Sequence, residues 1–157
     1  MSSGRELAST NSSQTNNLDT LYTGVLKIGE SEVPMNMVMD TGSSWLWVPL
    51  QNCSGCPNDL YTPDGGDSVS STPEQIVYGS GNVTGTQFTT SCTLEDLEVS
   101  SILTIGVDEA NGIDSEFMDG IMGLAPEPQG EGTNAELVVD KLKEYDLIDA
   151  KIFGVSF

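Results

Sequence analysis

The chain has 157 residues, with 24 acidic side chains against 5 basic ones and no histidine, so its formal net charge is -19. This length suits one domain. Five basic side chains are too few to neutralise a row of phosphates, and an anionic membrane would repel the chain. We therefore expect no nucleic acid and no membrane partner. Without histidine there are no Ser-His or Cys-His nucleophile pairs and the commonest zinc ligand is missing, so we predict no metal and no cofactor and carboxylates remain as the chemical resource.

The chain order predicts a polar leader followed by a β-rich domain. Residues 1–18 are dominated by Ser, Thr, Asn and Gln, which predicts a flexible leader outside the fold, and residues 19–157 form the domain. Tyr22 to Ile28 and the alternating Val33 to Met39 predict a hairpin. Further strands are predicted at residues 45–48, 75–78, 83–90 and 97–105. This spacing favours an all-β fold, an antiparallel sandwich or barrel.

One helix and a last strand are predicted near the end of the chain. Thr133 and Glu136 have the spacing of a capping box, and apolar residues from Leu137 onward recur at helical spacing. We therefore expect a single amphipathic helix of about three turns that packs on the sheet. The alternation in Lys151 to Phe157 predicts a final strand.

The cysteines and sequons bear on the cellular compartment. Cys53 and Cys56 have the spacing of a short disulfide or of a redox motif, and irregular chain around them favours the disulfide, with Cys92 left over. Three N-x-S/T sequons, at Asn11, Asn52 and Asn82, give weak support for secretion.

Charge and targeting signals leave the compartment open. No secretory signal peptide is visible, which fits a mature form, an expressed fragment or a cytosolic chain. Protonation of the carboxylates would leave little charge repulsion at acid pH, which fits an acidic lumen or a secreted protein, although a merely soluble acidic surface explains the count nearly as well.

The most informative segment is an apolar strand that delivers Asp40 into a turn containing Gly42. Burial at a strand end raises the pKa of a carboxyl group, whereas nearby hydroxyls and backbone amides stabilise its ionised form, so such a group is tunable for acid-base work. Asp-Thr-Gly by itself is weak evidence, since an Asp that stabilises a turn is the default interpretation of this tripeptide.

Further motifs carry a resemblance to a known family. In chain order they are Asp40-Thr41-Gly42-Ser43-Ser44, Leu46-Trp47-Val48-Pro49, Tyr78-Gly79-Ser80-Gly81 and Asp119-Gly120-Ile121-Met122-Gly123-Leu124-Ala125. From Leu21 to Phe157 the sequence resembles the amino-terminal lobe of the pepsin-like aspartic proteases. The resemblance implies an aspartic endopeptidase in which Asp40 is one of two aspartates that share a proton and hold the attacking water.

The resemblance also implies roles for residues around Asp40. Thr41 would bond across to the opposite lobe, Gly42 would let the substrate backbone approach, and Ser43 would orient the Asp40 carboxylate. Tyr78 would belong to a mobile hairpin, the flap. Trp47 would contact the hydroxyl group of Tyr78.

The substrate cleft is likewise defined by the resemblance. Gly79 and Ser80 would hydrogen-bond an extended peptide. Val38, Ile113 and Ile121 would line the pocket for the residue before the cut, so hydrophobic side chains are the expected preference there. Trp45 stands where many relatives carry a small polar residue.

The sequence contains no second Asp-Thr-Gly or Asp-Ser-Gly turn. One acid cannot serve as base and acid in the same step, so we expect this polypeptide alone to be nearly inactive. The favoured interpretation is a lobe that is completed by a carboxy-terminal lobe carrying the second Asp. The alternatives are a homodimer in which two copies of Asp40 meet, and a non-catalytic peptide-binding module.

Overall fold

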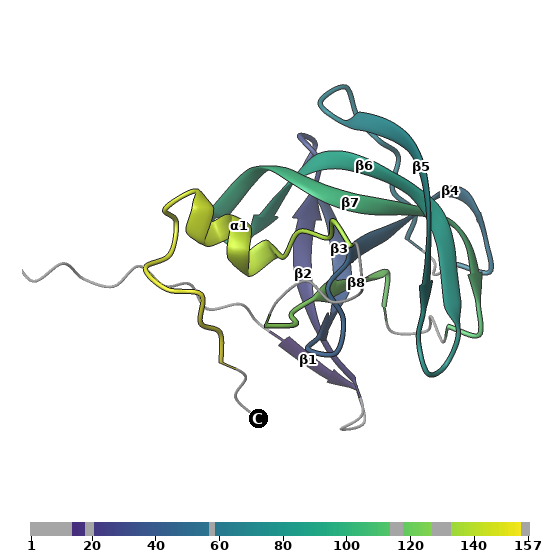
Figure 1. Cartoon of the computed structure of the whole chain (residues 1–157), viewed down its shortest axis with the longest axis horizontal. Helices are drawn as coiled ribbons and strands as arrows, with labels where there is room; N and C mark the ends of the chain where they lie inside the picture. Colours follow the sequence, from purple (N-terminus) through teal and green to yellow (C-terminus); the bar gives the residue numbers. More distant parts are fainter. Residues whose placement is uncertain (1–13, 18–20, 57–58, 114–117, 127–132, 155–157) are drawn as a thin grey trace, which may run out of the picture.

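The computed structural model describes residues 14–17, 21–56, 59–113, 118–126 and 133–154 (Figure 1). Within these residues it contains eight strands and one short helix. In chain order they are β1 Gln14–Asn17, β2 Leu21–Ile28, β3 Val33–Asp40, β4 Leu46–Ser54, β5 Ser68–Val77, β6 Asn82–Leu94, β7 Leu97–Asn111, β8 Gly120–Gly123 and α1 Val138–Glu144. This mostly β architecture with one helix confirms the predicted fold class.

The strands form one mixed sheet that closes on itself. Its order is β1-β2-β3-β8-β4-β7-β6-β5, and β2 also pairs with β6. That additional pairing joins Lys27 to Thr93 and Ile28 to Cys92, so six strands complete a ring in the manner of a barrel. Two pairs, β3 with β8 and β4 with β7, are parallel, which corrects the expectation of a wholly antiparallel arrangement.

Two clusters of buried side chains fill the domain. The first core cluster includes Leu26, Met37 and Leu46 together with Val138 and Leu142 of α1. The second core cluster surrounds Trp47 and contains Val38, Trp45 and Ile121. Neighbouring residues on a strand point to opposite faces. Leu46 therefore belongs to the first core cluster and Trp47 to the second, and β4 lies between the two clusters.

The helix is shorter than predicted and begins differently. It starts at Val138 after Leu137, which provides no side-chain cap, so the predicted capping box is wrong. The Thr133 hydroxyl instead accepts a hydrogen bond from the Ala135 amide, and Glu136 Oε2 accepts one from the Leu103 amide of β7 at 2.7 Å. Glu136 thus ties the segment before α1 to the sheet, and Figure 1 shows α1 beside β7.

The two ends of the chain also differ from expectation. Gln14–Asn17, within the predicted leader, pair with β2 as strand β1. Residues 151–154 form no strand, and residues 155–157 of the predicted last strand lie outside the described residues. Within the described part of the chain, no helix is long and apolar enough to cross a membrane.

Candidate active site

The site is built at the end of a parallel strand pair. Asp40 is the last residue of β3 and stands in register with Gly123 of β8. Its backbone carbonyl accepts a hydrogen bond from the Leu124 amide at 2.7 Å, so the neighbouring strand holds its main chain. Its half-buried carboxylate accepts a hydrogen bond from the Gly42 amide to Oδ1 at 2.9 Å. The turn therefore presents one carboxylate of defined orientation at the edge of the sheet.

Small residues make this turn possible. Thr41 and Gly42 are exposed, whereas the Ser43 carbonyl accepts a hydrogen bond from the Ala125 amide at 3.0 Å. A Cβ atom on Gly123 would lie 2.5 Å from the Ser44 carbonyl carbon and 2.7 Å from the Ser43 oxygen, so only glycine fits there. The turn after Asp40 packs directly on β8 for this reason.

Ser43 does not make its expected bond to Asp40 among the described residues. Its Oγ atom is buried there without a hydrogen-bond partner. The hydroxyl nevertheless lies near enough to Tyr78 to favour ionisation of that phenol. A role for Ser43 in orienting Asp40 therefore stays a prediction.

The predicted flap is the hairpin that joins β5 to β6. Val77 pairs with Asn82, and the Tyr78 amide donates to the Gly81 carbonyl at 2.7 Å to close its tip. Gly79 and Ser80 lie exposed within that tip. These amides at an accessible turn are of the type that can bind an extended peptide backbone.

Tyr78 connects the hairpin to the region of Asp40. The fully buried Trp47 donates from Nε1 to the Tyr78 hydroxyl at 2.9 Å, the contact that the resemblance implied. Burial raises the pKa of Tyr78 to about 12; the negative charge of Asp40 raises it further, and the Trp47 hydrogen bond opposes both. The phenol is therefore neutral throughout the acid range and lies within electrostatic reach of Asp40.

The predicted pocket residues gather in the second core cluster. Val38 and Ile121 are buried neighbours in register on β3 and β8. Ile113 and Tyr78 are partly buried and pack against the same cluster. Trp45 is 9% exposed and belongs to this cluster, so its indole fills space beside these residues. Contact of any of them with substrate stays a prediction.

A surface cavity lies elsewhere in the domain. Leu124, Leu137 and Phe153 contribute to its lining together with the Lys151–Asp140 ion pair, whose atoms are 3.0 Å apart. It therefore lies beside α1, and neither Asp40 nor Tyr78 lines it.

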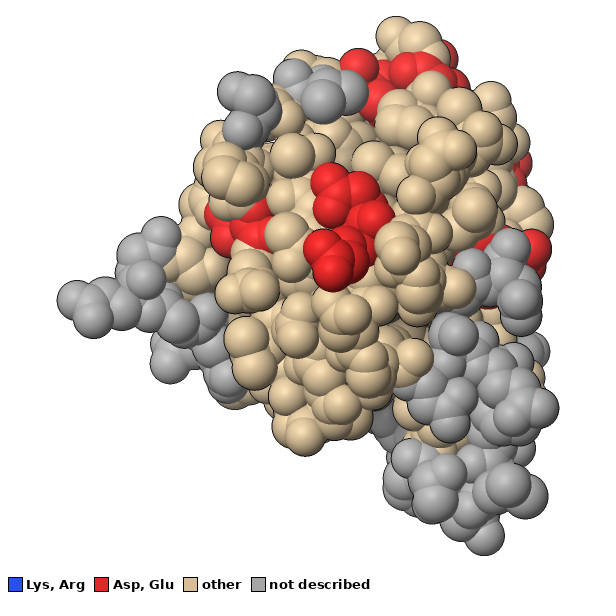
Figure 2. Space-filling view, turned by 90° about the vertical axis from the view of Figure 1, so that its right-hand side faces the viewer, with Lys and Arg blue, Asp and Glu red and all other residues tan. Residues whose placement is uncertain are grey.

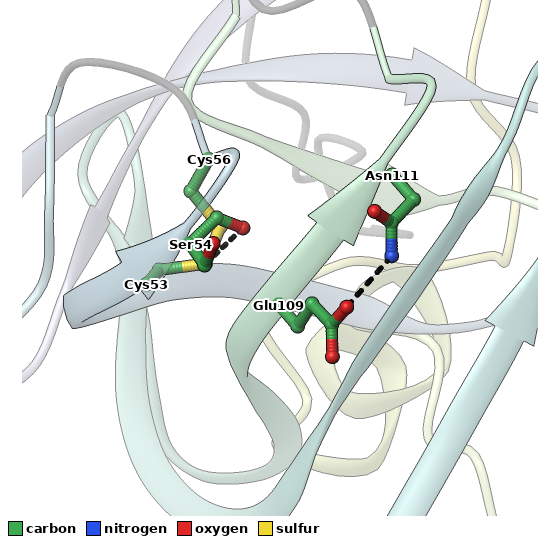
Figure 3. The surroundings of a disulfide bond; sticks show 5 residues. All are labelled: Cys53, Ser54, Cys56, Glu109 and Asn111. Atoms are coloured by element: carbon green, nitrogen blue, oxygen red, sulfur yellow. Dashed lines mark hydrogen bonds between the residues drawn. A yellow bond between two sulfur atoms is a disulfide. The ribbon is translucent and has the colours of Figure 1, made fainter.

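The cysteines are paired as the spacing predicted. Cys53 and Cys56 form a disulfide at the end of β4, and the Cys53 sulfur lies 3.8 Å from the Ser54 carbonyl oxygen (Figure 3). Ser54 is in register with Glu109 of β7, whose carboxylate accepts a hydrogen bond from Asn111 at 3.0 Å. Cys92 is a free, buried thiol whose pKa is raised to about 12 by burial.

Sequence reasoning assigned no role to Asp119, which the structure places at the other end of the β3–β8 pair. It is 8% exposed, and its Oδ2 accepts a hydrogen bond from the Asn36 amide at 2.6 Å. The Asp119 amide donates in return to the Asn36 carbonyl at 2.8 Å. Burial is the main cause that raises its pKa. An acid inside the apolar run from Met118 to Ala125 was the available signal.

Acidic side chains far outnumber basic ones in this chain. Figure 2 shows one face on which Asp and Glu are in view and no Lys or Arg is. All four lysines among the described residues lie in ion pairs with carboxylates: Lys27 with Glu32, Lys141 with Glu136 and Glu144, Lys143 with Asp146, and Lys151 with Asp140. Within the described residues, no group of three or more His, Cys, Asp or Glu side chains is placed to hold a metal ion.

Comparison with known proteins identifies the family of this chain. The family model of the eukaryotic aspartyl proteases matches residues 21–157, and the chain belongs to that family. It is 30% identical to pepsin A of Sus scrofa over 157 residues, covering 89% of this chain and 38% of that protein. It is 34% identical to cathepsin E of Aquarana catesbeiana, covering 89% of this chain and 37% of that protein.

A solved structure shares the fold. The aspartic proteinase from Irpex lacteus superposes with a TM-score of 0.73 at 24% identity, covering 89% of this chain and 40% of that one. The chain thus spans about two-fifths of the length of these relatives, which corresponds to one lobe.

Proposed function

We propose that this chain is the amino-terminal lobe of a pepsin-like aspartic endopeptidase. It supplies Asp40, the Tyr78 hairpin and half of a cleft for hydrolysis of peptide bonds next to hydrophobic residues at acid pH. The observation that carries the proposal is the hydrogen bond from Trp47 to Tyr78, because it fixes the hairpin within electrostatic reach of the Asp40 carboxylate. Membership of the aspartyl protease family supports this choice of reaction.

The chemistry requires a second carboxylic acid opposite Asp40. Two carboxyl groups that share one proton cannot both ionise, so one accepts a proton from the attacking water while the other donates to the substrate carbonyl. The Gly42 amide would keep Asp40 oriented for this exchange. The second acid would come from a complementary carboxy-terminal lobe, and no acyl-enzyme would form.

The remaining site residues have supporting roles in the proposal. Gly79 and Ser80 would bind the backbone of an extended substrate peptide when the hairpin closes. The apolar side chains around Val38 and Ile121 would favour a hydrophobic residue before the cut. The disulfide and the acidic surface support a secreted protein or one in an acidic lumen.

Cleavage of an unfolded protein at about pH 3.5 tests the proposal. The chain is assayed alone over a range of concentrations, and then with a separately expressed carboxy-terminal lobe that carries an Asp-Thr-Gly or Asp-Ser-Gly turn. We expect activity only in the mixture, and we expect Asp40→Asn to abolish it. Asp108→Asn is the matched control, because Asp108 is an exposed acid on β7 and its substitution should leave activity intact.

The other outcomes separate the alternatives. Activity of the chain alone that rises steeply with concentration would replace the proposal with a homodimer in which each copy contributes Asp40. Binding of hydrophobic peptides that survives Asp40→Asn, without cleavage in either arrangement, would establish a non-catalytic peptide-binding module.

A further inference from the structure

The sequon Asn52-Cys53-Ser54 occupies an irregular part of β4. Pro49 is in register with Val107 and Ser54 with Glu109, so four residues on β4, 50–53, stand opposite one residue on β7. The segment therefore bulges out of the ladder. Its partner on the other side is Tyr61, whose carbonyl accepts a hydrogen bond from the Gln51 amide at 3.0 Å.

Both functional side chains of this sequon are accessible. Asn52 and Ser54 are exposed, and Figure 3 shows Ser54 next to the disulfide at the end of the strand. Asn52 has φ 74°, a left-handed conformation that asparagine tolerates better than most residues. The amide acceptor thus projects from a turn-like bulge, the kind of site at which a modifying enzyme can reach the chain.

Asn82 provides a contrast within the same domain. It is half-buried and in register with Val77 on one side and with Asn111 on the other. Asn82 begins the middle strand of three, where pairing on both sides restricts its backbone more than in the bulge at Asn52. Asn11 lies outside the described residues.

We propose that Asn52 is an N-glycosylation site of this protein. The Nδ2 atom of Asn52 attacks the anomeric carbon of an oligosaccharide carried on a polyprenyl diphosphate. A carbon–nitrogen bond forms and the bond from that carbon to the diphosphate oxygen breaks. The diphosphate leaves with the bonding electron pair, and the amide loses one proton. The Ser54 hydroxyl completes the acceptor sequence.

The disulfide supports the compartment that this reaction needs. Cys53 is the middle residue of the sequon and is joined to Cys56, and such bonds form in oxidising compartments such as the lumen of the secretory pathway. The proposal rests on entry of the chain into that lumen and is independent of catalysis by Asp40.

Site-specific mass spectrometry tests the proposal. The full chain is secreted from eukaryotic cells behind a cleavable leader, purified, reduced, alkylated and digested. The protease is then inactivated, and the peptides are treated in heavy-oxygen water with an amidase that removes N-glycans. No Lys or Arg lies between Lys27 and Lys141, so a protease that cuts at aspartate is used. The peptide between Asp40 and Asp59 contains Asn52 as its one sequon. We expect a heavy-oxygen aspartate at position 52.

Paired variants separate glycosylation from a conformational role of Asn52. Ser54→Ala keeps the asparagine that the left-handed backbone favours and should abolish the label, whereas Ser54→Thr should retain or increase it. Asn82→Gln should leave the label at Asn52 unchanged. An unlabelled Asn52 in wild-type chain from cells that glycosylate a co-expressed reference protein would overturn the proposal, as would a glycan on Asn82 without one on Asn52. The labels at Asn52 and Asn82 can both be measured whether or not this chain cleaves peptides, so failure of this proposal is distinguishable from failure of the proposed function.

Discussion

The hydrogen bond between Trp47 and Tyr78 predicts a measurable coupling in the stability of the domain. Trp47 is fully buried, and its Nε1–H has the Tyr78 oxygen 2.9 Å away as its acceptor. Tyr78→Phe removes that oxygen and leaves a buried donor unsatisfied, which costs about 1–3 kcal/mol of unfolding free energy. Trp47→Phe removes the donor itself and also leaves a space in the second core cluster.

The double variant isolates the hydrogen bond from this packing loss. Once Trp47 is phenylalanine, Tyr78→Phe no longer strands a buried donor, so its cost should be smaller. The two substitutions should therefore be less than additive, with a coupling of about 1 kcal/mol or more. Urea unfolding of the wild-type chain, both single variants and the double variant measures this coupling without any requirement for enzymatic activity.

Tyr61 offers a matched control for the same chemical change. It is also buried and donates its hydroxyl to Asp67 Oδ2 at 2.7 Å, but it belongs to the first core cluster, whereas Trp47 belongs to the second. Tyr61→Phe combined with Trp47→Phe should be additive within about 0.5 kcal/mol. A Trp47–Tyr78 coupling no larger than that of the control pair would refute the argument that this bond fixes the hairpin.

Two further predictions concern the β3–β8 pair. Because burial raises the pKa of Asp119, its stabilising contribution is complete below the ordinary Asp value of 3.8 and is lost as pH rises through its folded value. Asp119→Asn should therefore make the unfolding free energy depend less on pH between 3.8 and the raised folded pKa of Asp119. Urea unfolding across this range checks the prediction, and an unchanged slope would contradict it. Gly123→Ala should destabilise the domain by about 1–3 kcal/mol, because its Cβ would meet the backbone of Ser43 and Ser44. Gly79→Ala is the control, since its Cβ meets nothing within 4 Å, and equal thermal shifts for the two variants would count against the packing argument.

Local patterns in the sequence predicted the elements whose burial follows a simple period. The alternation of Met35, Met37 and Met39 marks β3, because one face of that strand is covered by the core. The same logic located β2 and most of β6, but in β5 it predicted only the end from residue 75 and missed residues 68–74. The disulfide also followed from local spacing, since Cys53 and Cys56 are only three residues apart.

Tertiary contacts explain what those patterns missed. β8 was not predicted because all four of its residues are buried, so no alternation marks it, and it lies between β3 and β4. Glu136 was expected to cap a helix, but the Leu103 amide and Lys141 take its carboxylate instead. Residues 151–154 contain apolar side chains but form no strand in the described part of the chain.

The candidate site shows the same division between local and distant information. Asp40 and its bond to Gly42 belong to one turn, so the motif alone located them. The contact between Trp47 and Tyr78 joins residues 31 positions apart, and only the family resemblance anticipated it. The Asp119–Asn36 junction spans 83 positions and carries no motif for its pairing, so local patterns could not predict it.

The ionisation of this domain ties its architecture to acid conditions. Each described lysine already has a carboxylate partner, so the net charge of -19 reflects acids that have no cation to oppose them. Protonation at acid pH removes that repulsion. It also weakens ion pairs, among them the exposed pairs of Lys27 and Lys143, which stabilise little. Acid pH also favours the protonated form of Asp119, whose buried carboxyl group lies at the beginning of the strand pair that ends at Asp40. Acid therefore lowers charge repulsion across the domain and removes the cost of burying an ionised carboxylate at the start of the strand pair that carries Asp40.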